Sequence, residues 1–219
     1  MCSASLNEVS KVANIVSTNL ATVGASLSHV HVPGRGPTED FGNDDDVELG
    51  MGIHNEEGCK RLKTDLPGLV KQMLAQLLDS GDPDRAYVNI KSSDPIILLV
   101  NNLGGVSVLE IGFITEEVCT QLLADYSLRP VRILSGTYMS SLNGLGFSIS
   151  VLKAAETGLP SGQSMVDLLD TPVEATGWPA QIKPDTWTTV LEDTASSALS
   201  EDTEMESEPI LSRLKRKHL

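Results

Sequence analysis

An uninterrupted apolar run from Ile96 to Val100 constrains the fold more than any other feature of this sequence. The run contains several β-branched residues and no alternating polar ones, which is typical of a strand buried deep in a sheet. Asn101-Asn102-Leu103-Gly104-Gly105 follows, and asparagine side chains bond backbone groups in tight turns. We therefore predict a central strand at 96–100 that ends in a turn.

Apolar residues spaced by three and four predict amphipathic helices before and after this strand. The spacing runs from Leu6 to Val23, with Gly24 as a stop signal, and again from Leu66 to Leu77. A third segment runs from Val108 to Leu122, and a short fourth one covers Met165–Leu169. We expect these helices to cover the sheet.

Shorter apolar segments predict additional strands. Ser28–Val32 alternates as a strand does, and Val47–Leu49 is a short strand before a glycine-rich loop. Val131–Leu134 and Phe147–Leu152 also have strand character, and the turn residues between them predict an antiparallel pair. Helices alternating with strands, plus a late hairpin, predict an α/β (α+β) fold, a two-layer mixed sheet covered by helices, within residues 1–190.

Composition argues against several classes of function. A formal net charge of -14 argues against nucleic acid as a partner, because phosphate binding depends on clustered lysine and arginine. No apolar run approaches the roughly 20 residues that a membrane helix needs, so we expect no membrane association. Cys2, Cys59 and Cys119 are too few and too scattered for a disulfide framework or a cysteine-based zinc site. A reducing, cytoplasmic setting is the expectation.

The composition changes beyond about Leu191. Seven acidic residues and no basic one occur between Glu192 and Glu208, and basic residues follow from Arg213 to Lys217. Because too few apolar residues remain to offset chain entropy, we predict that residues 191–219 form a disordered tail. Its basic end is a solvated terminus or, alternatively, a localisation or partner-binding patch.

One histidine, His54, lies within the glycine-rich stretch Glu48–Gly58. Glycines at 50, 52 and 58 allow sharp turns and close backbone approach, so we expect the histidine to be presented at the surface. A neutral imidazole can act as a general base or add to an electrophilic carbonyl carbon. Glu56 and Glu57 are close enough in sequence to orient the ring or raise its basicity. The alternative is a loop histidine that only makes hydrogen bonds.

Other candidate sites have less support. His29 and His31 would share one face of the predicted strand, but no third ligand of matching type accompanies them, so we expect no metal site. A hydrolase could use His54 with Ser140 or Ser141, although the sequence has no G-x-S-x-G motif. It also has no Walker-type loop or dinucleotide fingerprint, so we assign no cofactor-binding residue.

Five separated stretches of the sequence agree with one family. They are Asn19–Gly24, Val32–Gly36, Glu48–Glu56, Val100–Gly105 and Gly136–Met139. Together they resemble the dihydroxyacetone (glycerone) kinase family, in the order expected for it and over roughly Leu6 to Trp178. The resemblance implies that the chain corresponds to the second α/β subdomain of the family's substrate-binding region.

In that family the histidine of the Gly-Ile-His stretch adds to the carbonyl of dihydroxyacetone and holds the substrate as a covalent hemiaminal. His54 occupies this position, so the resemblance implies that it is the substrate-binding nucleophile. Such a bond selects carbonyl substrates, dihydroxyacetone or glyceraldehyde, over simple polyols. The family commonly has Gly-Glu-Pro after the histidine, where this chain has Asn55, Glu56 and Glu57. Asparagine accepts left-handed geometry readily, whereas the loss of proline loosens the loop.

The family also has parts that we do not find in this sequence. Its first subdomain carries a second glycine-rich loop with its own histidine and a catalytic aspartate. An all-helical domain binds ATP and Mg²⁺ in the ATP-dependent members. Because phosphoryl transfer depends on positioning and charge neutralisation, we expect this chain to bind neither ATP nor Mg²⁺ and not to turn over alone.

Two functions follow from the resemblance. One is a fragment of dihydroxyacetone kinase that carries the substrate-binding half and acts as a homodimer or in association with the missing kinase domains. The alternative is a catalytically inactive module that binds carbonyl metabolites or serves dimerisation or regulation.

Overall fold

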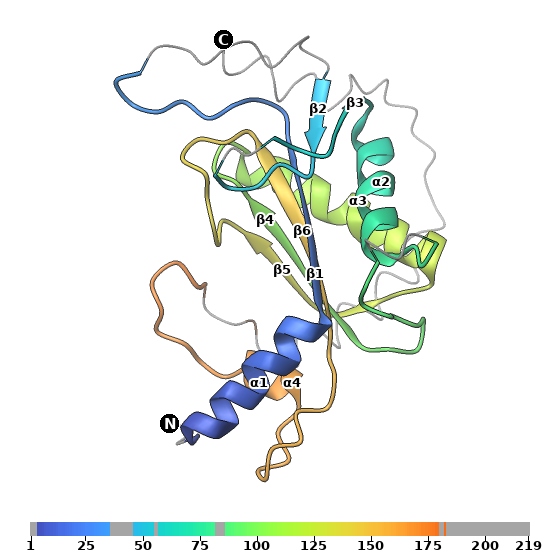
Figure 1. Cartoon of the computed structure of the whole chain (residues 1–219), viewed down its shortest axis with the longest axis vertical. Helices are drawn as coiled ribbons and strands as arrows, with labels where there is room; N and C mark the ends of the chain where they lie inside the picture. The colour runs from blue at the N-terminus through green and yellow to red at the C-terminus, as the bar shows by residue number, and fades with distance from the viewer. Residues whose placement is uncertain (1–3, 36–45, 55–56, 82–85, 180–181, 183–219) are drawn as a thin grey trace.

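The computed structural model describes residues 4–35, 46–54, 57–81, 86–179 and 182. These residues form one mixed six-stranded sheet with helices packed against it (Figure 1). The strands are β1 (Leu20–Ser26), β2 (Asp46–Leu49), β3 (Lys60–Lys63), β4 (Ile96–Asn102), β5 (Pro130–Gly136) and β6 (Gly146–Lys153). The helices are α1 (Leu6–Asn19), α2 (Leu66–Leu78), α3 (Val108–Tyr126) and α4 (Met165–Leu169). The predicted α+β class, a mixed sheet with helices, is confirmed.

The strands lie in the order β3-β2-β1-β6-β4-β5. Among the described strands, β4 and β5 are parallel, and every other neighbouring pair is antiparallel. Ile96, Leu98 and Val100 of β4 are completely buried, because β6 and β5 flank this strand and helices cover one of its faces. The buried strand predicted at 96–100 is therefore confirmed.

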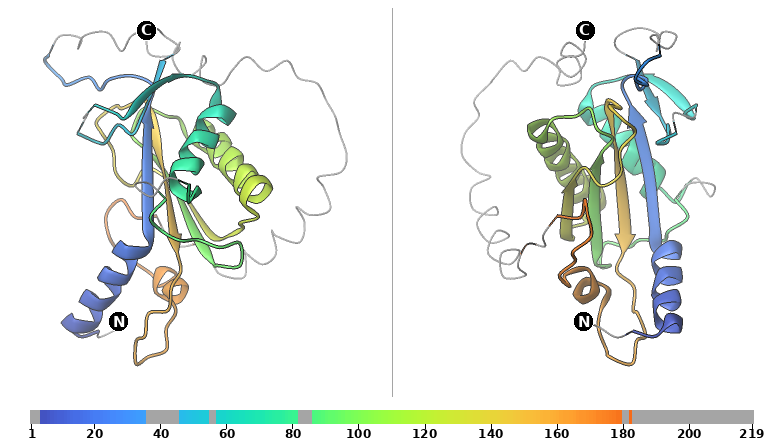
Figure 2. Two further views of the ribbon diagram at one scale, coloured as in Figure 1. Left: turned by 45° about the vertical axis from the view of Figure 1, so that its right-hand side comes forward. Right: turned by 90° about the vertical axis from the view of Figure 1, so that its left-hand side faces the viewer.

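Helices α2 and α3 cover one face of the sheet and pack against each other (Figure 2). Asp65 caps the N-terminus of α2, and Ser107 with Glu110 forms a capping box at the start of α3. The residues that the helices bury repeat at helical spacing and are Leu66, Leu69, Val70, Met73, Leu74 and Leu77 of α2 and Ile111, Ile114, Val118 and Leu122 of α3. Full burial of each such side chain stabilises the fold by roughly 1.5–3 kcal/mol. Both predicted helices are confirmed, and α3 continues beyond the predicted end to Tyr126.

The N-terminal segment differs from the prediction. The helix predicted from Leu6 to Val23 ends at Asn19, and β1 begins at Leu20. Each residue of β1 pairs with β6, so long-range strand pairing overrides the local helical spacing. Residues 28–32, predicted as a strand, form none, because the pairing of β1 already ends at Ser26.

The antiparallel pair predicted from 131–134 and 147–152 is wrong. β5 and β6 run in opposite directions, but β4 lies between them and pairs with both. The connection 137–145 passes from one side of β4 to the other, so neighbours in sequence are not neighbours in the sheet. The sequence also gave no signal for β3, whose Lys-Arg-Leu-Lys composition is polar. Charged side chains are common on edge strands, where they discourage further pairing.

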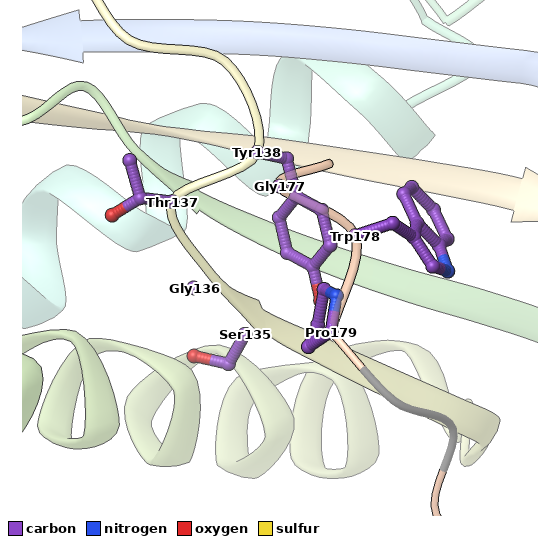
Figure 3. Close-up of a pocket in the computed structure, with 7 residues that line it drawn as sticks. All are labelled: Ser135, Gly136, Thr137, Tyr138, Gly177, Trp178 and Pro179. Atoms are coloured by element: carbon purple, nitrogen blue, oxygen red, sulfur yellow. The ribbon is translucent and has the colours of Figure 1, made fainter. Parts of the chain in front are cut away.

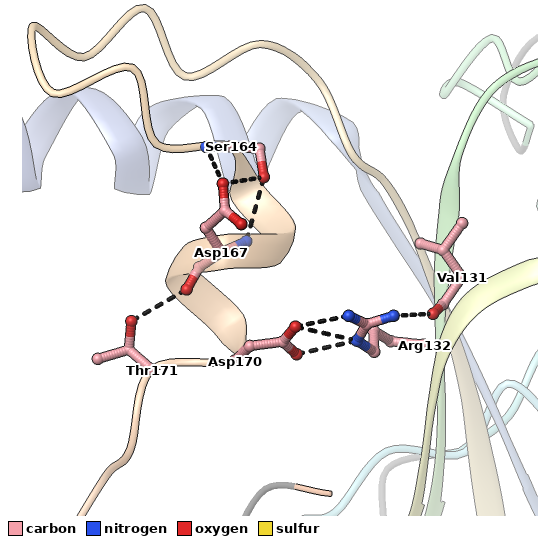
Figure 4. A network of polar contacts seen from close by, with 6 residues as sticks. All are labelled: Val131, Arg132, Ser164, Asp167, Asp170 and Thr171. Atoms are coloured by element: carbon pink, nitrogen blue, oxygen red, sulfur yellow. Dashed lines mark hydrogen bonds and ion pairs between the residues drawn. The ribbon is translucent and has the colours of Figure 1, made fainter. Parts of the chain in front are cut away.

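The short helix α4 is held against β5 by an ion pair between Arg132 and Asp170 (Figure 4). Arg132 Nε donates to Asp170 Oδ1 at 2.9 Å, and Nη2 donates to Oδ2 at 2.6 Å. This hydrogen-bonded contact raises the pKa of Arg132 above its ordinary value. Hydrogen bonds from Ser164 at the start of α4 lower the pKa of Asp167. The helix predicted at 165–169 is confirmed.

Two predictions fall on parts of the chain without a description. The predicted disordered tail, residues 191–219, lies outside the described residues, as does the domain boundary at residue 190. None of the helices in the described ranges combines the length and the apolarity needed to cross a membrane.

Candidate functional site

Three connections between elements meet at one end of the sheet. They are residues 50–59 between β2 and β3, residues 103–107 between β4 and α3, and residues 137–145 between β5 and β6. Ser141 joins them, because its N–H donates to the Leu103 carbonyl at 2.7 Å and its hydroxyl donates to the Ile53 carbonyl. The loop that carries His54 therefore contacts the connection after β5, and Ser141 links it to the connection after β4.

The start of the loop 50–59 lies directly against β1. Gly50 N–H donates to the Gly24 carbonyl at 2.7 Å, and a Cβ on Gly24 would lie 2.6 Å from the Met51 carbonyl oxygen. Gly50 has a φ of 84°, in the left-handed region that favours glycine. At the other end of the loop, Cys59 N–H donates to the Leu49 carbonyl at 2.8 Å. The sharp turn predicted at Gly50 is confirmed, and Gly24 allows close backbone approach instead of ending a helix.

His54 is exposed in this loop. A small molecule can reach an exposed imidazole from solvent, which nucleophilic addition to a carbonyl requires. Glu57 is also exposed, whereas Asn55 and Glu56 lie outside the described residues. The effect of Glu56 and Glu57 on the ring stays a prediction, as does the catalytic role of His54.

Asn101, at the end of β4, fixes the start of the connection 137–145. Its side chain is only 3% exposed. Asn101 Oδ1 accepts hydrogen bonds from Tyr138 N–H at 2.8 Å and Met139 N–H at 3.0 Å, and Nδ2 donates to the Met139 carbonyl at 2.8 Å. The side-chain amide therefore supplies hydrogen-bond partners to backbone groups of this turn that have none in a helix or strand.

Asn102 shapes the neighbouring turn in the same way. Its Oδ1 accepts from Gly104 N–H at 2.8 Å and Val106 N–H at 3.1 Å. Its Nδ2 donates to the Val106 carbonyl at 2.7 Å and to Thr137 Oγ1 at 3.1 Å. The prediction that the asparagines bond backbone groups in a tight turn is confirmed.

The two serines that a hydrolase could use have different surroundings. Ser141 is buried and its hydroxyl donates to the Ile53 carbonyl, so it holds two loops together. Ser140 is exposed. The sequence lacks the G-x-S-x-G motif that forms the strained turn around a hydrolase serine. Because the Ser141 hydroxyl donates to a backbone carbonyl, it gives the hydrolase interpretation no further support.

His31 lies on the segment after β1 and contacts the connection 137–145. Asn143 Oδ1 accepts from the backbone N–H of His31 at 2.9 Å, and Asn143 Nδ2 lies 3.1 Å from His31 Nδ1.

In the ranges that the structure describes, no three His, Cys, Asp or Glu residues come close enough together to hold a metal ion. These residues therefore do not fit a magnesium or zinc site, and no chemical step is assigned to a metal.

An open hollow of about 410 Å³ lies at the end of β5 (Figure 3). It is lined by residues 135–138 and 177–179. Tyr138 and Trp178 contact each other edge to face, with ring centroids 5.0 Å apart and an interplanar angle of 62°. Burial raises the pKa of Tyr138 above its ordinary value. No lining residue belongs to the loop 50–59, so this hollow is distinct from the surroundings of His54.

Comparisons with known proteins agree on one family. The family model described as the Dak1 domain matches residues 2–177. The dihydroxyacetone kinase of Pichia angusta is 40% identical over 196 residues, which cover 84% of this chain and 32% of that protein. Dihydroxyacetone kinase 1 of Saccharomyces cerevisiae is 44% identical over 184 residues, which cover 80% of this chain and 31% of that protein. The chain spans about a third of the length of the curated relatives it matches.

Solved structures show the same fold. A dihydroxyacetone kinase from C. freundii, in complex with AMP-PNP and Mg²⁺, aligns with a TM-score of 0.66 and 25% identity, covering 93% of this chain and 33% of that one. A dihydroxyacetone kinase operon co-activator aligns with a TM-score of 0.68 and 25% identity, covering 82% of this chain and 51% of that one. The mixed sheet and its helices are therefore an arrangement shared with these proteins.

Proposed function

The chain belongs to the Dak1 domain family, and on this premise we propose that it is the substrate-binding part of a dihydroxyacetone kinase. In this proposal His54 forms a covalent hemiaminal with dihydroxyacetone or glyceraldehyde, and the other parts of the enzyme supply phosphoryl transfer. Residues 1–190 form the C-terminal subdomain of the substrate-binding region, and residues 191–219 form a separate tail.

The observation that carries the proposal is the exposure of His54 on a loop that is fixed from several sides. Gly24 and Ser141 hold the backbone just before the imidazole, through Gly50 and Ile53, and Cys59 N–H donates to the Leu49 carbonyl beyond it. A nucleophile on a fixed loop loses little conformational entropy when it binds its substrate. This arrangement supports covalent capture of a small ketone that arrives from solvent.

The addition itself needs no oxidant, metal or cofactor. The lone pair of one ring nitrogen of His54 forms a bond to the carbonyl carbon, and the π bond of the carbonyl group breaks. The carbonyl oxygen takes up a proton while the other ring nitrogen gives one up, so the adduct is neutral overall. Triols such as glycerol have no electrophilic carbon of this kind, so they form no adduct.

We assign ATP and Mg²⁺ to other parts of the complete enzyme. The C. freundii kinase structure contains AMP-PNP and Mg²⁺, and this chain covers 33% of its length. The described residues of this chain include no group suited to a metal ion. In this proposal phosphoryl transfer requires association with a nucleotide-binding domain. The chain acts as a homodimer or in association with those kinase domains, and we place the protein in the cytoplasm.

A second candidate function is regulatory. The similarity to a dihydroxyacetone kinase operon co-activator supports it, because that protein shares this fold and is named for gene control. In this case the chain binds a carbonyl metabolite, or a second protein, without phosphoryl transfer. The two candidates share the histidine and differ in whether the captured triose is ever phosphorylated.

Carbon-13 NMR tests the proposal directly. The purified chain of 219 residues is mixed with dihydroxyacetone labelled at its carbonyl carbon. We expect a protein-bound signal at the shift of a tetrahedral carbon, which disappears in His54→Ala. The matched control is His31→Ala, which removes another exposed loop histidine and should leave the adduct unchanged.

Two results would overturn the covalent role. One is the absence of a tetrahedral signal at saturating dihydroxyacetone, and the other is an equal signal in His54→Ala. To separate the two candidate functions, the chain is then mixed with ATP, Mg²⁺ and the separately produced nucleotide-binding domain of the Saccharomyces cerevisiae relative. Formation of dihydroxyacetone phosphate supports the kinase, whereas an adduct that is never phosphorylated supports the regulatory module.

A further inference from the structure

A buried carboxylate lies at the base of the loop that carries His54. Glu48 belongs to β2 and is 1% exposed, although glutamate is almost never fully buried without a partner. It lies between Ser26 of β1 and Arg61 of β3 in the strand pairing. The chemistry assigned to His54 does not use this carboxylate, so its burial requires another explanation.

One oxygen of Glu48 holds the far end of the loop. Gly58 N–H donates to Glu48 Oε1 in a short hydrogen bond. A Cβ on Gly58 would lie 2.7 Å from Glu48 Cγ and 2.5 Å from the Leu49 carbonyl oxygen. Glycine is therefore required where the returning backbone passes over the carboxylate.

The other oxygen of Glu48 takes part in a long ion pair. Oε2 lies 3.4 Å from Arg61 Nε, and the Arg61 side chain is half-exposed. Within the described part of the chain, Oε2 is buried and accepts no hydrogen bond. The stronger contact of the carboxylate is therefore the one to the backbone of the loop, and a hydrogen bond to a charged acceptor is about twice as strong as a neutral one.

We propose that Glu48 is a positioning residue that closes the loop 50–58 and thereby fixes His54 for addition to the substrate carbonyl. Gly50 is held on Gly24 at one end of the loop, and Gly58 is held on Glu48 at the other. Without the contact to Glu48, the loop keeps the hydrogen bonds of Gly50, Ile53 and Cys59, but Gly58 is no longer held. The imidazole then samples more orientations, and fewer of them suit addition. This inference rests on the proposed covalent role of His54.

An isosteric pair of variants tests the proposal. Glu48→Gln keeps an oxygen that accepts from Gly58 N–H, whereas Glu48→Met has similar length and only a weakly accepting thioether sulfur. We expect Glu48→Met to weaken adduct formation with labelled dihydroxyacetone by roughly 10-fold to 100-fold, because small misplacements of reacting groups have effects of this size. Glu48→Gln should stay within about 3-fold of the wild type, since it retains a hydrogen bond from Gly58 N–H, now to a neutral acceptor.

A stability control separates positioning from folding. Leu122→Ala removes a fully buried side chain from α3, which lies on the helical layer and not in the loop. It should lower the thermal midpoint at least as much as Glu48→Met while leaving the adduct constant of the folded protein unchanged. Equal adduct constants for wild type, Glu48→Met and Glu48→Gln would overturn the proposal.

Hydrogen exchange gives a test that does not depend on adduct formation. The Gly58 amide of the wild type should exchange at least 10-fold more slowly than an unbonded loop amide, and Glu48→Gln should retain part of this protection. Exchange at the rate of an unbonded amide would show that the closure does not exist. If the wild type forms no adduct but Gly58 is protected, the role of His54 fails while the closure by Glu48 stands.

Discussion

Replacing Asn101 by alanine is expected to destabilise the chain by about 1.5–4.5 kcal/mol. The side chain is 3% exposed and makes hydrogen bonds with Tyr138 N–H, Met139 N–H and the Met139 carbonyl. Each such bond contributes about 0.5–1.5 kcal/mol, and their sum gives the expected loss. Because alanine leaves these backbone groups without their partners, the loss should fall toward the upper end of this range.

Urea unfolding followed by circular dichroism measures this loss. The midpoint should fall while the slope of the transition stays unchanged, because the variant exposes no additional surface on unfolding. The matched control is Asn14→Ala, at an exposed position of α1, where alanine is the better helix former by several tenths of a kcal/mol. An Asn101→Ala variant within about 0.5 kcal/mol of the wild type would refute the role given to this amide.

Gly24 and Cys119 give three further predictions. Gly24→Ala would bring a Cβ to 2.6 Å from the Met51 carbonyl oxygen, so it should lower the thermal midpoint and weaken the tetrahedral carbon-13 signal of the adduct. An unchanged midpoint and an unchanged signal would show that the loop does not need this close approach. Burial raises the pKa of Cys119 to about 11 from an ordinary value of 9.0, so iodoacetamide should alkylate it far more slowly at pH 8 than the exposed Cys59, as peptide mass mapping would show. Since the unfolded thiol ionises near pH 9 and the folded one resists ionisation, stability should also fall as the pH rises above about 9.

The parts of the fold that sequence predicts well are those whose burial repeats with a local period. Helix α2 buries every apolar position of its stripe, and β4 is apolar from Ile96 to Val100 because this part lies inside the sheet. In both elements the apolar positions along the chain are the positions that the fold buries, because the geometry of the helix or strand sets both. The prediction therefore needs no knowledge of distant residues.

The N-terminal segment shows where this reasoning fails. Leu20 and Val23 continue the spacing of α1, yet they belong to β1. Helix α1 buries none of its residues completely, whereas β1 buries Ala21, Val23 and Ala25 against the helical layer. The strand forms because β6 and β2 pair with it, and a single sequence carries no local signal for partners that lie far along the chain.

The same distinction applies to the candidate site. Glycines around His54 indicate that the histidine is presented, and the structure shows it exposed. The contacts that orient its loop come from distant parts of the chain. The hydroxyl of Ser141 donates to the Ile53 carbonyl across 88 residues of sequence, and the Gly24 carbonyl of β1 accepts from Gly50 N–H. A motif can thus name the reacting side chain, but its precision depends on polar contacts between loops that only the fold brings together. Variants at Gly24 or Ser141 should therefore alter capture of a ketone at His54, although neither residue is the nucleophile.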